Sequence, residues 1–182
     1  MRDDNELISI YKEGNTEGFK ELLEKYTPVV YNFVRRLAGE GNADDLTQET
    51  FIKVWKNLGR FDAEKSGFKT WLFTIARNTA YDFLRKKKSF NFSDLENDDS
   101  DFNFSDSISD ENLLPDEALQ KMEDKEFLNK ILDHLRADYR EVLVLHYQEE
   151  MTFDQIGKVL GSPLNTVKSK HYRALIELRK ML

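Results

Sequence analysis

The stretch MTFDQIGKVLGSPLNTVKSKHYRALIELRK, residues 151–180, decides the fold of the C-terminal part of this chain. Thr152 and Gln155 have the spacing of a capping box, in which each side chain bonds the backbone of the other residue at a helix start. Apolar residues at helical spacing follow, and Gly161 suits the left-handed conformation that ends a helix. Ser162-Pro163 then favours a second helix start. The sequence therefore predicts two short helices joined by a tight turn.

The second of these helices has two unlike faces. One face is an apolar stripe made of Leu164, Val167, His171, Ala174, Leu175 and Leu178. The rest of the helix surface is polar or basic and comprises Thr166, Lys168, Ser169, Lys170, Tyr172 and Arg173. We expect the apolar stripe to be buried and the polar side to be free to bind a partner.

A steep crossing of two short helices needs a small residue at the contact, and Gly157 supplies it. Gly157, Gly161 and Val167 have the spacing of a DNA-binding helix-turn-helix, whose second helix lies in the major groove. An ordinary helical hairpin within a bundle is the alternative. From Met151 to the C-terminus, however, there are six Lys and Arg residues and two Asp and Glu residues, in a chain of net charge −7. That local positive charge favours a surface that faces phosphates.

The composition bounds the chemistry. A length of 182 residues fits one or two small domains. The chain has no cysteine, which excludes disulfides and thiol catalysis, and its three histidines are too scattered for a metal site. No glycine-rich phosphate loop or Ser/His/Asp pattern is visible, so we expect no catalytic residue, no metal and no cofactor. No apolar run approaches the ~20 residues of a membrane span, and the acidic N-terminus lacks a signal-peptide core. We expect a cytoplasmic protein without membrane insertion.

Charge divides the chain into three parts. Residues 1–88 carry 16 basic and 14 acidic groups, residues 89–116 carry no basic and 9 acidic groups, and residues 117–182 carry 11 of each. The middle part is rich in Ser, Asp and Asn and has no periodicity, so we expect a disordered acidic linker. Helical periodicity dominates on both sides of it. The predicted fold is all-α, with two small helical domains.

Helix starts can be predicted at several other positions. Thr16 is expected to cap a helix in the first domain, and Asn42 to cap a helix over residues 43–58. Pro115 is expected to open the first helix of the second domain. Asp138 with Glu141 forms a further capping pair before the helix that leads into Met151.

The predicted helix over residues 43–58 combines a core stripe with an unusual second face. Its core stripe is expected to include Trp55. The second face carries Asp45, Gln48, Glu49 and Ile52. An apolar side chain among carboxylates and an amide suggests a docking surface, although single exposed apolar residues are common.

A second basic region, residues 68–88, carries six basic residues and one acidic residue. A stripe of rings, an amide and cations runs along its predicted helix and comprises Trp71, Arg77, Asn78, Tyr81, Arg85, Lys86, Lys87 and Lys88. Unpaired nucleotides need flat surfaces for their bases and positive charge for their backbone. We therefore favour single-strand binding over the alternative, in which Trp71 and Tyr81 merely close the core.

Two motifs in this order resemble the sigma-70 family of bacterial RNA polymerase sigma factors, in particular the extracytoplasmic-function (ECF, group 4) type. DDLTQETFIKVWKNLGRF (residues 44–61) with FKTWLFTIARNTAYDFLRKKK (residues 68–88) looks like region 2. YREVLVLHYQEEMTFDQIGKVLGSPLNTVKSKHYRALIELRK (residues 139–180) looks like region 4. The resemblance covers nearly the whole chain. Asn165 departs from it, because relatives often carry glycine there.

The resemblance implies a set of partners and roles. The face with Asp45, Gln48, Glu49 and Ile52 would dock on the clamp helices of the RNA polymerase β′ subunit, with further contacts to the β subunit. The loop Asp62–Gly67 and the stripe from Trp71 to Lys88 would capture the opened strand of a promoter −10 element. The polar face of the last helix, with Thr166, Lys168, Ser169, Lys170, Tyr172 and Arg173, would read the −35 element. An anti-sigma factor is a further expected partner, and the free protein is expected to be a monomer.

Two other functional classes compete with this interpretation. A two-domain regulator, with an N-terminal sensor or partner-binding domain, would use the helix-turn-helix on duplex DNA, but a sensor has no need for the ring-and-cation stripe of residues 71–88. A metal hydrolase built on Asp44, Asp45 and Glu49 is the remaining class. Adjacent acids on one helix point in different directions, which disfavours a metal cage.

Overall fold

A computed structural model describes residues 2–89, 132 and 134–181 of the chain. The chain divides into two compact units, Met1–Ser93 and Asp94–Leu182. Every regular element in the described ranges is helical, which confirms the prediction of an all-α fold. The predicted acidic linker, apart from Ser89, and most of the helix expected from Pro115 lie outside the described residues. Within the described residues, no helix is long and apolar enough to cross a bilayer.

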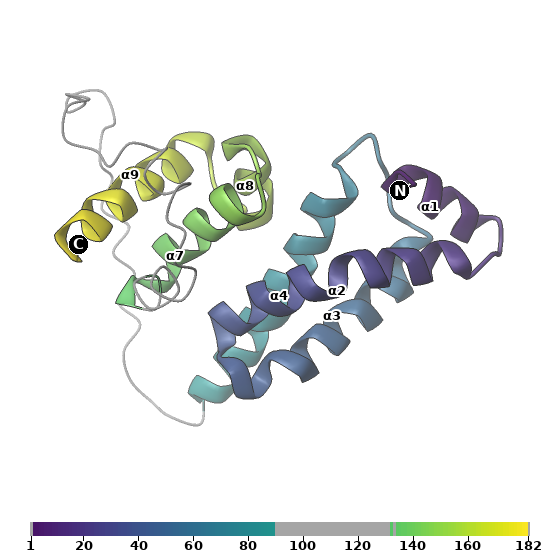
Figure 1. Ribbon diagram of the computed structural model, residues 1–182, viewed down its shortest axis with the longest axis horizontal. Coiled ribbons are helices and arrows are strands. Elements are labelled where there is room, and N and C mark those ends of the chain that lie inside the picture. Colours follow the sequence, from purple (N-terminus) through teal and green to yellow (C-terminus); the bar gives the residue numbers. More distant parts are fainter. Residues whose placement is uncertain (1, 90–131, 133, 182) are drawn as a thin grey trace. The chain divides into compact units, whose positions relative to one another are not determined.

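Unit 1 is a bundle built around one long helix, α2 (Figure 1). Its elements are α1 (Asp4–Lys12), α2 (Glu17–Ala38), the short 3-10 turn η1 (Glu40–Asn42), α3 (Ala43–Leu58) and α4 (Phe68–Ser89). Helix α2 contacts α1, α3 and α4, and α3 packs on α4. Phe33 of α2 and Phe73 of α4 meet edge to face, with ring centroids 5.0 Å apart, at the centre of the bundle.

Two predicted helix caps in unit 1 are wrong. Thr16 makes no side-chain cap bond, and the neighbouring Asn15 instead accepts a hydrogen bond from the backbone N–H of Glu17 at 3.0 Å. Asn42 does not cap α3, because its side-chain amide donates backward to the Ala38 carbonyl oxygen at 2.7 Å. In both cases a short polar side chain satisfies a neighbouring backbone group in place of the expected one.

Unit 2 contains α7 (Ala137–Leu143), the π-helical turn η3 (Val144–Gln148), α8 (Phe153–Leu160) and α9 (Leu164–Met181). Helix α9 packs against α7 and α8. Asp138 and Glu141 do not form the predicted capping pair. The residue before α7 is Arg136, without a side-chain cap bond, and Glu141 is buried within the helix at 1% exposure.

The turn between α8 and α9 forms as predicted. The Gln155 backbone N–H donates to Thr152 Oγ1 at 3.3 Å, and the Thr152 N–H donates to Gln155 Oε1 at 2.8 Å, which completes the capping box. Gly161 ends α8 with φ 62°, in the left-handed region. A Cβ at Gly157 would lie 2.9 Å from the Ser162 carbonyl oxygen, a backbone atom that cannot swing away. The close approach of α8 to the turn that leads into α9 therefore depends on Gly157.

This approach makes Gly157→Ala a test of the helix crossing. We expect the substitution to lower the free energy of local opening of α8 and α9 by about 1–3 kcal/mol, because overpacking against backbone forces the helices apart. Amide hydrogen exchange of α8 and α9 in the full chain measures this, with α3 and α4 as internal references. Gly59→Ala is the matched control, since a Cβ there meets nothing within 4 Å. Unchanged exchange in Gly157→Ala would refute the role of this glycine.

Candidate nucleic-acid interface

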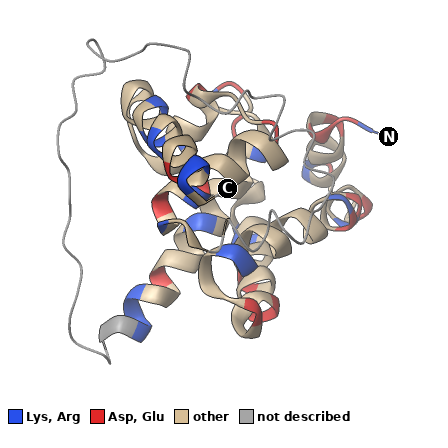
Figure 2. Ribbon diagram, turned by 60° about the vertical axis from the view of Figure 1, so that its left-hand side comes forward, with Lys and Arg blue, Asp and Glu red and all other residues tan. Residues whose placement is uncertain are grey.

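Helix α9 is buried along one side only. Val167, Ala174, Leu175 and Leu178 are buried toward α7 and α8, as the apolar stripe predicts. Leu164 and His171, from the same stripe, are half-buried at its edge. The predicted contact residues leave part of their surface accessible: Thr166 is exposed, and Lys168, Ser169, Lys170, Tyr172 and Arg173 are half-buried. Figure 2 shows basic residues along this helix, which ends at the label C.

Lys170 lies at the margin of this face. Its ammonium is 3.7 Å from the Asp138 carboxylate of α7, and both side chains are about 30% exposed, at 29% and 30%. An ion pair this accessible contributes at most about 1 kcal/mol. Lys170 therefore remains able to turn toward a phosphate, but Asp138 offsets part of its charge.

A cluster of rings holds the first half of α9 against its neighbours. Tyr147 Oη and His171 Nε2 are 3.0 Å apart, within hydrogen-bond distance. The His146 ring stacks on Phe153 at 4.5 Å between centroids and lies 5.2 Å from His171. Periodicity placed His171 in the apolar stripe, but its polar contact with η3 could not be read from spacing. The cluster fixes α9 to both η3 and α8.

In unit 1, α4 carries the other predicted nucleic-acid face. Asn78 is exposed, while Trp71, Arg77 and Tyr81 are half-buried on the same side of the helix. The Arg77 guanidinium lies over the Tyr81 ring, 4.5 Å from its centroid. The Trp71 ring packs 5.2 Å from Phe61 and 5.9 Å from Phe68, between centroids. Trp71 thus covers the core with one part of its surface and leaves another part accessible.

The last turns of α4 are basic and accessible. Arg85, Lys86 and Lys87 are exposed, and Figure 2 shows their blue segments at the end of this helix. Arg85 pairs with Asp82 at 2.9 Å, but with side chains 81% and 49% exposed the pair is readily exchanged for a phosphate. Lys88 belongs to α4, and its side chain lies outside the described residues.

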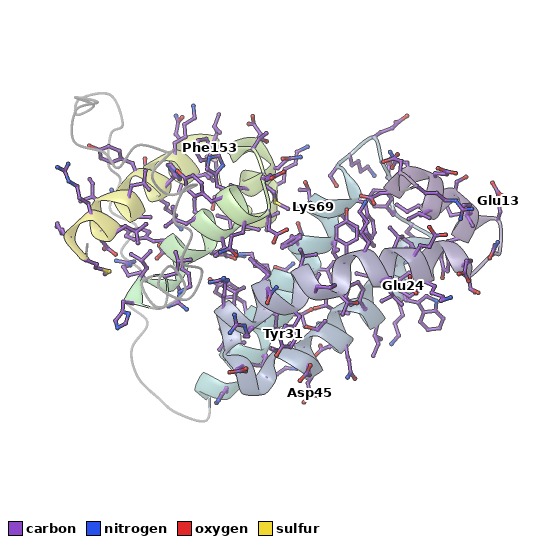
Figure 3. All side chains as sticks on the ribbon, in the orientation of Figure 1. Glu13, Glu24, Tyr31, Asp45, Lys69 and Phe153 are labelled. Atoms are coloured by element: carbon purple, nitrogen blue, oxygen red, sulfur yellow. The ribbon has the colours of Figure 1, made fainter. Side chains whose placement is uncertain are left out.

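Helix α3 presents the predicted docking face. Asp45, Gln48 and Glu49 are exposed, and the stick view shows Asp45 at the outer surface of the bundle (Figure 3). Ile52 is 50% exposed although it is apolar. Glu49 forms an ion pair with Lys53 at 2.8 Å on the same helix.

Trp55 does not belong to the core, contrary to the sequence prediction. It is 52% exposed, because Phe51, Val54 and Leu58 already fill the contact with the bundle. Trp55 is three residues from Ile52, so the two side chains are neighbours on one helix face. The helix therefore exposes a pair of apolar residues beside its carboxylates. The sequence prediction left Trp55 out of this face because large apolar residues are usually buried.

The described residues contain no group of three or more His, Cys, Asp or Glu side chains that could hold a metal ion. In particular, Asp44, Asp45 and Glu49 do not form such a group.

Comparison with known proteins identifies the family. Over 96% of its length, the chain is 32% identical to the ECF RNA polymerase sigma factor SigW of Bacillus subtilis (strain 168), and the match covers 94% of that protein. The chain belongs to the ECF sigma factors. Within the chain, residues 22–90 match the family Sigma-70 region 2, and residues 128–178 match Sigma-70, region 4. The RNA polymerase sigma-H factor of Pseudomonas aeruginosa is 29% identical over 100% of the chain and 95% of its own length.

Solved structures with a similar fold include a sigma factor. The sigma factor RpoE of Bartonella quintana, crystallised with the anti-sigma factor NepR, aligns with a TM-score of 0.66 at 26% identity, over 89% of this chain and 94% of RpoE. CnrH, solved with the cytosolic domain of CnrY, shares the fold with a TM-score of 0.66 at 22% identity, over 98% of this chain and 96% of CnrH.

Proposed function

We propose that this ECF sigma factor binds core RNA polymerase and directs promoter-specific transcription initiation by recognising −10 and −35 elements and assisting DNA melting. One observation carries the proposal: the chain holds two separate basic faces, on α4 and on α9, and each lies within the sigma-70 region that matches it. We place the region 2 domain at residues 1–88, the acidic linker at residues 89–116 and the region 4 domain at residues 117–182.

The α4 face is proposed to hold the opened strand. Tyr81 and the accessible part of Trp71 offer surfaces on which a base can stack, and the exposed amide of Asn78 can bond a base edge. The loop Asp62–Gly67, which leads into α4, completes this site. Arg77, Arg85 and the lysines at the end of α4 attract the phosphates. Trapping unpaired bases in this way lowers the free energy of the melted state without ATP.

The α9 face is proposed to read the intact −35 duplex. A helix of this length fits the major groove when its opposite side is buried, as the side of Val167 and Ala174 is here. Arg173 and Ser169 lie opposite that buried side, with Thr166 near the start of the helix. The residues on either side of these three can contact phosphates: Lys168, Lys170 and Tyr172. Asn165 stands at the helix start and alters which groups reach the DNA there.

The α3 face is proposed to dock on the β′ clamp helices. Ile52 and Trp55 supply apolar contact area, and Asp45, Gln48 and Glu49 surround it with polar and negative groups. This composition matches a protein interface, in which an aromatic anchor is enclosed by a polar rim. The β subunit is a further proposed partner.

The remaining partners follow from the relatives. The RpoE structure contains an anti-sigma factor, and we propose that a protein of that kind controls this chain as well. The chain would act in the cytoplasm as a monomer when free, without catalysis of its own. The competing regulator with an N-terminal sensor is disfavoured, because residues 22–90 match a sigma-70 region and carry the ring-and-cation stripe.

Run-off transcription with core polymerase tests the two DNA faces separately. Asn78→Ala removes one base contact and should lower initiation about 5- to 150-fold, as the loss of about 1–3 kcal/mol predicts. Arg173→Ala should lower it by a similar factor. A template with a pre-opened −10 bubble should restore Asn78→Ala more than Arg173→Ala, since only the former acts on melting.

Glu24→Ala, an exposed change on α2, is the control and should transcribe like the wild type. Wild-type activity of Asn78→Ala on duplex templates would refute the proposed role of the α4 face. Equal rescue of both variants by the bubble would refute the assignment of melting to the α4 face and of duplex recognition to the α9 face.

Binding to core polymerase tests the docking face. Trp55→Ala should weaken binding at least about 30-fold, because truncating an aromatic anchor typically costs about 2 kcal/mol or more. Asn57→Ala, another exposed residue of α3, is the matched control and should bind normally. Fluorescence anisotropy of labelled protein titrated with core polymerase measures both. If Trp55→Ala bound as tightly as Asn57→Ala, the docking face would lie elsewhere.

A further inference from the structure

A hydrogen bond from α1 holds the segment between α3 and α4. The Lys12 ammonium, on the last residue of α1, donates a hydrogen bond to the Phe61 carbonyl oxygen at 2.9 Å. Phe61 is the last residue before the loop Asp62–Gly67 that we assign to strand capture. The bond joins residues 49 positions apart, and its acceptor is a backbone oxygen next to the loop.

The ring of Phe61 packs against aromatic residues of α4. Its centroid lies 5.8 Å from that of Phe68 and 5.2 Å from that of Trp71, and the residue is only 5% exposed. The ring anchors Phe61 to α4, and the carbonyl anchors it to α1. The position at which the chain enters the loop is thus set by two elements instead of one.

Helix α1 is itself packed and hydrogen-bonded against α2. Gly18 of α2 allows a close approach, because a Cβ there would collide with the Leu7 carbonyl oxygen of α1. Leu7 and Ile8 are buried at 2% and 4% exposure. The Asp4 carboxylate receives hydrogen bonds from the Lys25 ammonium and the Tyr26 hydroxyl, both at 2.6 Å. The Tyr26 ring in turn contacts Phe68, with centroids 5.5 Å apart.

We propose that Lys12 is a positioning residue for recognition of the opened strand: it ties the start of the loop Asp62–Gly67 to α1 and so sets where the loop meets an unpaired base. The inference rests on the proposed function of this loop. Lys12 itself touches no DNA in this account. Removing its ammonium releases the Phe61 carbonyl, and the loop then occupies a wider range of positions over the α4 face. Selectivity for one base over another should suffer more than overall affinity, because phosphate contacts tolerate such displacement and base-edge contacts do not.

Lys12→Met tests the proposal, since it keeps the length of the side chain and removes the donor. Lys20→Met is the matched control: it removes the same charge from an exposed position of α2, where Lys20 pairs with Glu17 of its own helix. Lys12→Arg retains a cationic donor and should restore the wild-type behaviour.

The first measurement is base preference in the holoenzyme. DNA duplexes with a bubble, whose unpaired strand carries a randomised six-base segment, are captured by the full chain with core polymerase and sequenced. A specific base contact gives a preference of about 5- to 150-fold. Lys12→Met should reduce that preference to less than half of the wild-type value at one or two positions and leave the others unchanged, with Lys20→Met like the wild type.

The second measurement is amide hydrogen exchange of residues 61–67 in the free full chain, which does not depend on DNA or polymerase. Exchange there should be several-fold faster in Lys12→Met, with α2 and α3 unchanged. Where the wild type shows a base preference, equal behaviour of Lys12→Met and Lys20→Met in either measurement would overturn the proposal. A wild type without any base preference would instead refute the proposed function of the loop, and the exchange data would still decide whether Lys12 anchors it.

Discussion

Burial of one side of a long helix is the constraint on which both units depend. Helices α4 and α9 each turn small and aliphatic residues toward their neighbours, and the helical period then dictates which residues point outward. In α9, burial of Val167 and Ala174 at 0% exposure leaves Arg173 on the opposite side. In α4, burial of Leu72 and Ala76 at 0% leaves Asn78 exposed. The cores therefore place the groups that can contact nucleic acid, and no separate binding loop is needed to present them in unit 2.

Much of the described part of unit 2 could be predicted because its signals are local. The capping box of Thr152 and Gln155 and the left-handed Gly161 each involve residues a few positions apart, and both are present as predicted. The small residue at the crossing, Gly157, follows from the shortness of the turn. The all-α class follows in the same way from periodicity alone. The residues that share a face of α4 or α9 could also be predicted from their spacing, because the helical period is constant along a continuous helix.

The errors arose where several groups compete for the same space in the core or for the same backbone group. Trp55 has the right spacing for the core but is displaced by Phe51 and Val54, which face the bundle more directly. Asn42 was free to cap α3 or to bond backward, and the 3-10 turn before α3 selected the second option. The bond from Lys12 to Phe61 spans two helices and leaves no trace in the local sequence. Such choices depend on tertiary packing and cannot be derived from periodicity.

The central claim is that two modest nucleic-acid faces become effective only when core polymerase carries both. Each face offers only a few cations, so neither unit alone should bind a promoter tightly at cellular salt. When both units are bound to one polymerase, the second DNA contact becomes intramolecular. Footprinting of a cognate promoter with the purified chain, with and without core polymerase, measures this directly. The account predicts no protection by the free chain at nanomolar concentration, and protection of both the −35 and −10 elements once core polymerase is added. Nanomolar protection by the chain alone would contradict it.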